Sequence, residues 1–191
     1  DFGPIYSSFG YNEAEGIRLR AGGRTYFGPN DPWRLQGYTA YGFKDKKFKF
    51  GLSGKVLLDH KARLIVSGGY RQDVEQIAAS LTTSTDVLGR NLASSSLVTV
   101  GNNDQLTSIK LANFAIEAEF FKNFKVRSDI SYRTLESASP TFNLDYYTDF
   151  TQTEVKSQIK QTELVLSGIF EPGKHTSGYG VERTVTNEWF P

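Results

Sequence analysis

The residues that could support catalysis are few and widely separated in this chain of 191 residues. The two histidines, His60 and His175, both fall in segments predicted to be turns, where a histidine is typically solvated. The sequence has no Gly-x-Ser-x-Gly nucleophile elbow, no glycine-rich phosphate loop and no cysteine. The sequence therefore predicts a protein that is not an enzyme and that holds neither a metal nor a cofactor.

Two glutamates have the spacing that a general acid/base pair would require. Glu117 and Glu119 are two positions apart in a predicted strand, so their side chains point to the same face. Asp129 lies on the next predicted strand, together with Arg127 and Arg133. Because basic residues surround these carboxylates, the pattern favours an interior ion network over catalysis.

Basic residues in the first half of the chain form a second candidate site. They lie on the polar side of successive predicted strands, and the interior wall that they define comprises Arg18, Arg20, Arg24, Arg34, Lys49 and Lys55. If fixed acidic residues neutralise this wall, its role is structural. If they do not, the wall faces an anionic plug, a lipid headgroup or a solute. We expect the structural role.

The segment at residues 15–27 shows how these arginines are positioned. Apolar or small residues alternate with arginines along EGIRLRAGGRTYF, which is the period of a β-strand. At helical spacing the arginines would surround the cylinder, so a helix is disfavoured. A strand with lipid on one side and a wet lumen on the other fits this alternation. A soluble sheet with one solvated face is the alternative.

The same alternation recurs along most of the chain. It predicts antiparallel strands over residues 14–28, 33–44, 47–58, 63–72, 107–121, 124–135 and 156–170, with a further strand at 179–189. Long loops are expected near 73–106 and 137–155, and the helical spacing of Val74, Ile77, Ala78 and Leu81 suggests a helix that begins at Asp73. Short turns alternate with long loops, as in an up-and-down barrel.

Composition narrows the class of protein further. The net charge is +1, which gives no argument for nucleic-acid binding, and no apolar run approaches the ~20 residues of a membrane-spanning helix. Aromatic residues make up 14% of the chain and flank several turns. We therefore predict an all-β, antiparallel, up-and-down transmembrane β-barrel, in which residues 1–191 form one outer-membrane β-barrel segment. A soluble barrel or sandwich is the alternative.

Several motifs carry a resemblance to a known family. They include NEAEGIRLRAGG at residues 12–23, AYGFKDK at 40–46, YRQDVEQ at 70–76 and GYGVER at 178–183. These segments resemble the barrel portion of large outer-membrane proteins of diderm bacteria, whose barrel is classed as a domain of unknown function. In that family a carboxypeptidase-regulatory-like domain precedes the barrel. The barrel is distantly similar to the outer-membrane assembly and translocation superfamily.

The resemblance implies a location in the outer membrane of a diderm bacterium. The expected partners are outer-membrane lipid or lipopolysaccharide and other outer-membrane proteins or lipoproteins, but not nucleic acid. The expected function is non-enzymatic, in envelope transport, assembly or scaffolding. An outer-membrane enzyme that acts on lipid and an anion-preferring porin-like channel are the alternatives. Because the chain begins abruptly at Asp1, we expect it to form part of a larger barrel.

Overall fold

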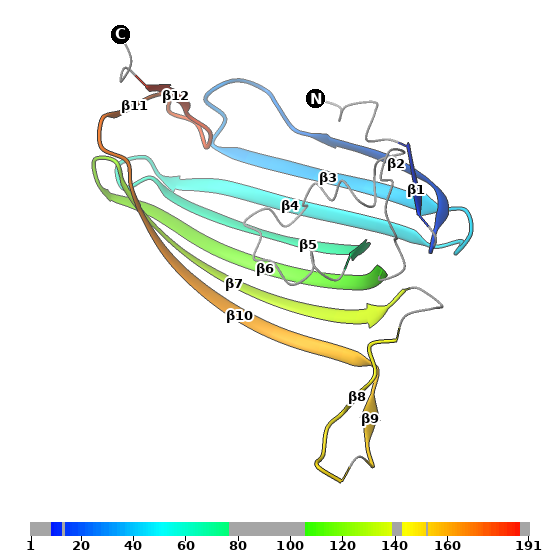
Figure 1. Cartoon of the computed structure of the whole chain (residues 1–191). Coiled ribbons are helices and arrows are strands. Elements are labelled where there is room, and N and C mark those ends of the chain that lie inside the picture. Colours follow the sequence, from blue (N-terminus) through cyan, green and yellow to red (C-terminus); the bar gives the residue numbers. More distant parts are fainter. Residues whose placement is uncertain (1–8, 13, 77–105, 139–142, 152, 188–191) are drawn as a thin grey trace.

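The computed structural model describes residues 9–12, 14–76, 106–138, 143–151 and 153–187, and all regular structure in these ranges is β-strand. Eight antiparallel strands form one curved sheet (Figure 1), in the order β1-β2-β3-β4-β5-β6-β7-β10. These strands are β1 (Phe9–Asn12), β2 (Gly16–Arg24), β3 (Trp33–Gly42), β4 (Phe48–Asp59), β5 (Leu64–Gln76), β6 (Leu106–Phe121), β7 (Phe124–Ser137) and β10 (Gln158–Phe170).

Two small ribbons extend from the ends of this sheet. One pairs β8 (Tyr146–Tyr147) with β9 (Val155–Lys156), and the other pairs β11 (Lys174–Ser177) with β12 (Thr184–Asn187). Figure 1 shows that β10 leads back along the edge of the sheet, so that β11 and β12 lie near the start of β3. The chain therefore returns from the last strand of the sheet to its first strands.

The sheet does not close on itself within the described residues. Every strand from β2 to β7 pairs with two neighbours, whereas β1 and β10 are the two edges of this part of the chain. The prediction of antiparallel strands is confirmed, and the seven main ranges differ from the observed strands by a few residues at their ends. The architecture is thus an open, curved, all-β sheet.

Two local predictions differ from the structure, and part of one lies outside the described residues. Asp73 does not begin a helix, because β5 continues through Gln76 and pairs with β6 along this stretch. Residues 77–105, which contain the rest of the predicted helix and most of the first long loop, lie outside the described residues. The strand predicted at 179–189 is shorter, since β12 begins at Thr184 and pairs with β11 rather than with the main sheet. Residues 178–183 form an irregular segment instead.

The two faces of the sheet differ in chemistry. One face, here called the apolar face, carries exposed large hydrophobic side chains, among them Ile17, Leu19, Phe50, Leu52, Ile116 and Ile130. The opposite face, here called the polar face, carries buried charged residues, among them Arg18, Arg34, Lys49, Arg71, Asp73 and Arg133. This distribution is the reverse of the usual soluble one, in which hydrophobic side chains are buried and charges are exposed.

Candidate functional site: the ion-paired polar face

The strand register brings the polar side chains together. Because side chains alternate across a strand, Arg18 and Arg20 on β2 share a face with Tyr38 on β3 and with Lys49 on β4. β5 adds Arg71 to this face, opposite Gly51 on β4. The polar face therefore collects charges from strands that are distant in sequence.

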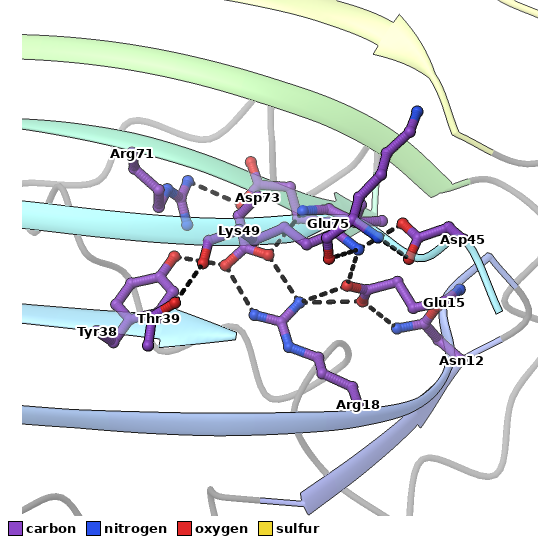
Figure 2. Close-up of polar contacts among 12 residues, drawn as sticks. Asn12, Glu15, Arg18, Tyr38, Thr39, Asp45, Lys49, Arg71, Asp73 and Glu75 are labelled. Atoms are coloured by element: carbon purple, nitrogen blue, oxygen red, sulfur yellow. Dashed lines mark hydrogen bonds and ion pairs between the residues drawn. The ribbon is translucent and has the colours of Figure 1, made fainter. Parts of the chain in front are cut away.

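Arg18 lies at the centre of the main cluster, which Figure 2 shows. Its guanidinium binds Asp73 through two hydrogen bonds, Nη1 to Oδ1 at 2.7 Å and Nη2 to Oδ2 at 3.0 Å. The same Nη1 contacts Glu15 Oε2 at 3.0 Å. All three side chains are buried, so these charges compensate one another where water cannot.

Lys49 extends the cluster towards the β3–β4 turn. Its ammonium lies 2.7 Å from Glu15 Oε1 and also binds Asp45. Asn12 holds the shared Glu15 in place, because its side-chain amide donates to the carboxylate and its Oδ1 accepts the Glu15 backbone N–H at 2.8 Å. Gly42 leaves room for this arrangement, since a Cβ there would lie 2.8 Å from the Glu15 Cβ.

Tyr38 connects the cluster to Arg20. Its hydroxyl donates to Asp73 Oδ2 at 2.5 Å, and its ring lies beneath the Arg20 guanidinium, whose Cζ is 3.7 Å from the ring centroid. Arg71 completes the row through a 2.8 Å ion pair with Glu75. Asp73 therefore accepts hydrogen bonds from both an arginine and a tyrosine, which fixes its position.

A second group lies at the other end of the polar face, where the β2–β3, β4–β5 and β6–β7 turns lie. This end is here called the short-turn end. Arg34 donates to the backbone carbonyl of Thr25 at 2.8 Å, and its guanidinium lies 3.4 Å from Glu182. Lys55 binds the other oxygen of Glu182 at 3.0 Å. Arg34 belongs to the same predicted wall as Arg18 and Arg20, but it binds Glu182, near the C-terminal end of the chain, instead of the cluster around Asp73. Arg24 occupies the exposed end of β2.

The predicted acidic residues lie on β6 and β7, each beside a cation. Glu117 is 3.6 Å from Arg127 and 3.5 Å from Lys125, while Asp129 binds Arg127 at 2.7 Å. Glu119 binds Arg183 at 3.0 Å. Arg133, which the sequence placed in this group, binds Glu163 on β10 instead. The carboxylates are therefore engaged as ion-pair partners.

The two histidines lie apart from these clusters. His60 is exposed in the turn between β4 and β5, and His175 is exposed on β11. Within the described residues, no three histidine, cysteine or acidic side chains gather as a metal site would require. No helix in these residues is long and apolar enough to cross a bilayer.

The sequence interpretation missed the acidic partners of the basic wall. The loop predicted near 73–106 contains Asp73 and Glu75, and no pattern in the sequence singles out Glu15, Asp45 or Glu182 as partners of the wall. One available signal was the continued alternation of Arg71, Asp73 and Glu75, which puts all three on one face of an extended strand. No comparable signal marks Glu182, because its partners lie on strands far away in the sequence.

The polar face has the chemistry of an internally neutralised wall. Fixed carboxylates bind its buried cations Arg18, Arg34, Lys49, Arg71 and Arg133. Its strands belong to an antiparallel sheet that is open within the described residues. The class defined by the fold is therefore an all-β protein with one ion-paired face and one exposed apolar face. No family model matches this chain, and no curated protein and no solved structure shows significant similarity to it.

Proposed function

We propose that this chain is a non-enzymatic wall segment of an outer-membrane β-barrel, which serves as a scaffold in envelope assembly or transport. The observation that carries this proposal is the reversed distribution of side chains. Ile17 and Leu19 are 58% and 39% exposed, whereas Arg18 between them is 1% exposed. A lipid environment on the apolar face makes this arrangement favourable, since the hydrophobic side chains would then leave water.

The dimensions of the strands support this placement. A membrane-crossing β-strand needs ~9–11 residues, and β2, β3 and β4 have 9, 10 and 12. Aromatic side chains gather near both ends of these strands. Tyr41 packs against Phe48 at one end, and Phe27 packs against Trp33 at the other. Two aromatic belts separated by aliphatic residues match the two interfaces of a bilayer.

The ion pairs support a scaffold over an open conduit. Each of Arg18, Lys49 and Arg71 has a fixed carboxylate partner, so these cations do not require a mobile anion. A rigid, neutralised interior suits a wall that holds its shape, whereas a selective pore needs uncompensated charge along its path. The assignment to envelope assembly or transport rests on the family resemblance.

The membrane placement is tested by lipid quenching of single fluorophores. The chain lacks cysteine, so Leu52→Cys on the apolar face and Ser53→Cys on the polar face give a matched pair of adjacent labelling sites. We expect a bimane attached at position 52, in the protein reconstituted into liposomes, to be quenched by spin-labelled acyl chains. A bimane attached at position 53 should not be quenched by the spin-labelled acyl chains, whether or not iodide in the water quenches it. Equal quenching by lipid at both positions would refute the proposal.

A further inference from the structure

Residues 178–183, here called the crossing segment, connect β11 to β12 and contact the short-turn end of the sheet. The Tyr179 N–H donates to Asn30 Oδ1 at 2.9 Å, and the Val181 N–H donates to the Asp31 carbonyl at 2.8 Å. A Cβ at Gly180 would lie 2.7 Å from the Asn30 carbonyl carbon, so the two backbones are in close contact. The crossing segment is thus seated on the β2–β3 turn.

Arg63, which immediately precedes β5, holds the same segment from the other side. Its Nη1 donates to the Gly180 carbonyl at 2.7 Å, and its Nη2 donates to the Val181 carbonyl at 3.4 Å. The Arg63 side chain is buried in this contact. Arg183 then reaches Glu119 at the end of β6. The segment therefore touches the β2–β3 turn, the residue that precedes β5 and the end of β6.

Glu182 points onto the polar face itself. Its carboxylate binds Lys55 at 3.0 Å and Arg34 at 3.4 Å, and it thereby covers two cations of the predicted basic wall. Burial raises the pKa of Glu182, but the hydrogen bond from Lys55 and the charges of Lys55, Arg34 and Arg24 outweigh it, so the pKa is lowered overall. The ionised carboxylate is the form that holds the segment in place.

The contacts of the crossing segment differ in kind from those of the sheet. It has no ladder pairing with the main sheet, and Val181 is its buried hydrophobic residue. Its other contacts are ion pairs and single hydrogen bonds, and the Glu182 and Lys55 side chains are 41% and 37% exposed. Partly exposed ion pairs are weak and are screened by salt.

We propose that the crossing segment is a releasable strap that closes the short-turn end of the polar face. When it leaves, Arg34, Lys55 and Arg63 lose their partners in the segment and this end of the face becomes open to solutes. Salt should favour release, because it screens the Glu182 ion pairs. This proposal goes beyond the scaffold role and does not depend on membrane insertion, since the contacts lie within one chain.

The test is the labelling rate of a cysteine beside Lys55 in the full chain folded in detergent. Ser67 faces Lys55 across the β4–β5 ladder and is half-buried, so Ser67→Cys reports on this end of the polar face. In that background we expect Glu182→Gln to raise the rate of labelling by a charged maleimide several-fold, because the ion pair that it removes from Lys55 is partly exposed and therefore weak. Lys55→Met, which leaves the contact of Glu182 with Arg34 in place, should raise the rate by less than Glu182→Gln does.

The control is Glu154→Gln, which removes an exposed ion pair to Lys156 at the opposite end of the molecule (Figure 1) and should leave the rate unchanged. If the cysteine introduced by Ser67→Cys is labelled at the same rate in the Glu182→Gln variant as in the Glu154→Gln control, the strap proposal is wrong. If that variant does not fold, hydrogen exchange on the unaltered chain decides. The Val181 amide should exchange faster than ladder amides such as Val56, and more so in high salt. Equal protection at every salt concentration would overturn the proposal.

Discussion

Arg18 and Asp73 are 55 positions apart in the sequence, yet two hydrogen bonds of 2.7 Å and 3.0 Å join their side chains. Two strands, β3 and β4, separate the strands that carry them. Adjacent strands lie ~4.8 Å apart, so the two backbones are about 14 Å apart along the sheet. The pair therefore spans the polar face and ties β2 to β5, which favours the curvature of the sheet.

Removing one partner of this pair should be strongly destabilising. Arg18→Ala leaves Asp73 buried without its main counter-charge, and we expect a loss of about 3–5 kcal/mol in the free energy of unfolding. The double variant Arg18→Met with Asp73→Asn should lose less, because neither charge remains and the amide oxygen at position 73 can still accept from the Tyr38 hydroxyl. Urea unfolding in detergent measures both. The matched control is Lys156→Ala, which breaks the exposed ion pair between Lys156 and Glu154. If Arg18→Ala and Lys156→Ala lower the free energy of unfolding equally, the prediction is wrong.

Gly42 should tolerate no side chain. A Cβ at this position would lie 2.8 Å from the Glu15 Cβ and 2.9 Å from the Lys49 Nζ, so Gly42→Ala must displace the ion cluster. We expect a loss of about 1–3 kcal/mol, as overpacking typically gives. Gly54→Ala is the control, because its Cβ would lie 3.5 Å from Leu35. Thermal unfolding of the two variants should differ clearly, and similar midpoints would count against this account.

Gly180→Ala should release the crossing segment without changing any charge. The added Cβ would meet the backbone of the turn at Pro29 and Asn30, including the Asn30 Cα at 2.8 Å, and backbone atoms yield less readily than a flexible side chain. We expect the Val181 amide to exchange several-fold faster, roughly as 1 kcal/mol of strain would give. The amides of the β4–β5 ladder serve as the internal reference. Unchanged exchange at Val181 would show that the contact is looser than the structure indicates.

The stability of the crossing segment should decrease in acid. The lowered pKa of Glu182 means that its contribution to stability is present above the unfolded glutamate pKa of about 4.3 and is lost as the pH falls through the folded value. Carbon-13 NMR of the Glu182 carboxylate should therefore give a midpoint below that of an exposed glutamate. Replacing Lys55 by methionine should raise the midpoint. If the midpoint does not change in this variant, Lys55 does not stabilise the ionised Glu182 carboxylate and the prediction is wrong.

Reconstitution into planar bilayers distinguishes the scaffold from a conduit. Because fixed carboxylates bind Arg18 and Lys49, we expect the full-length protein to give no steady anion-selective current. The double variant Arg18→Glu with Arg20→Glu should lose its fold, as judged by circular dichroism and protease resistance. A steady anion current that reverses its selectivity in a folded double variant would instead favour the conduit.

Much of the strand arrangement could be read from the sequence, and residues 47–58 show why. Their alternation of lysine or serine with phenylalanine, leucine or valine is a local property of the backbone, and β4 was predicted to within a residue. At residues 73–76 the helical spacing was misleading. Pairing with β6 supplied the backbone hydrogen bonds of these residues, and that pairing decided their conformation.

The sequence by itself determined which side chains share a face, since alternation depends only on neighbours along one strand. It placed Arg18, Arg20, Lys49 and Lys55 on one face and Ile17, Leu19 and Phe50 on the other. The tertiary structure alone decided the partners of each charge: Asp73 for Arg18, and Glu182 for Lys55. Those choices depend on strand order, on the curvature of the sheet and on the return of the chain to its first strands. These features arise from contacts between distant residues, which no local pattern encodes.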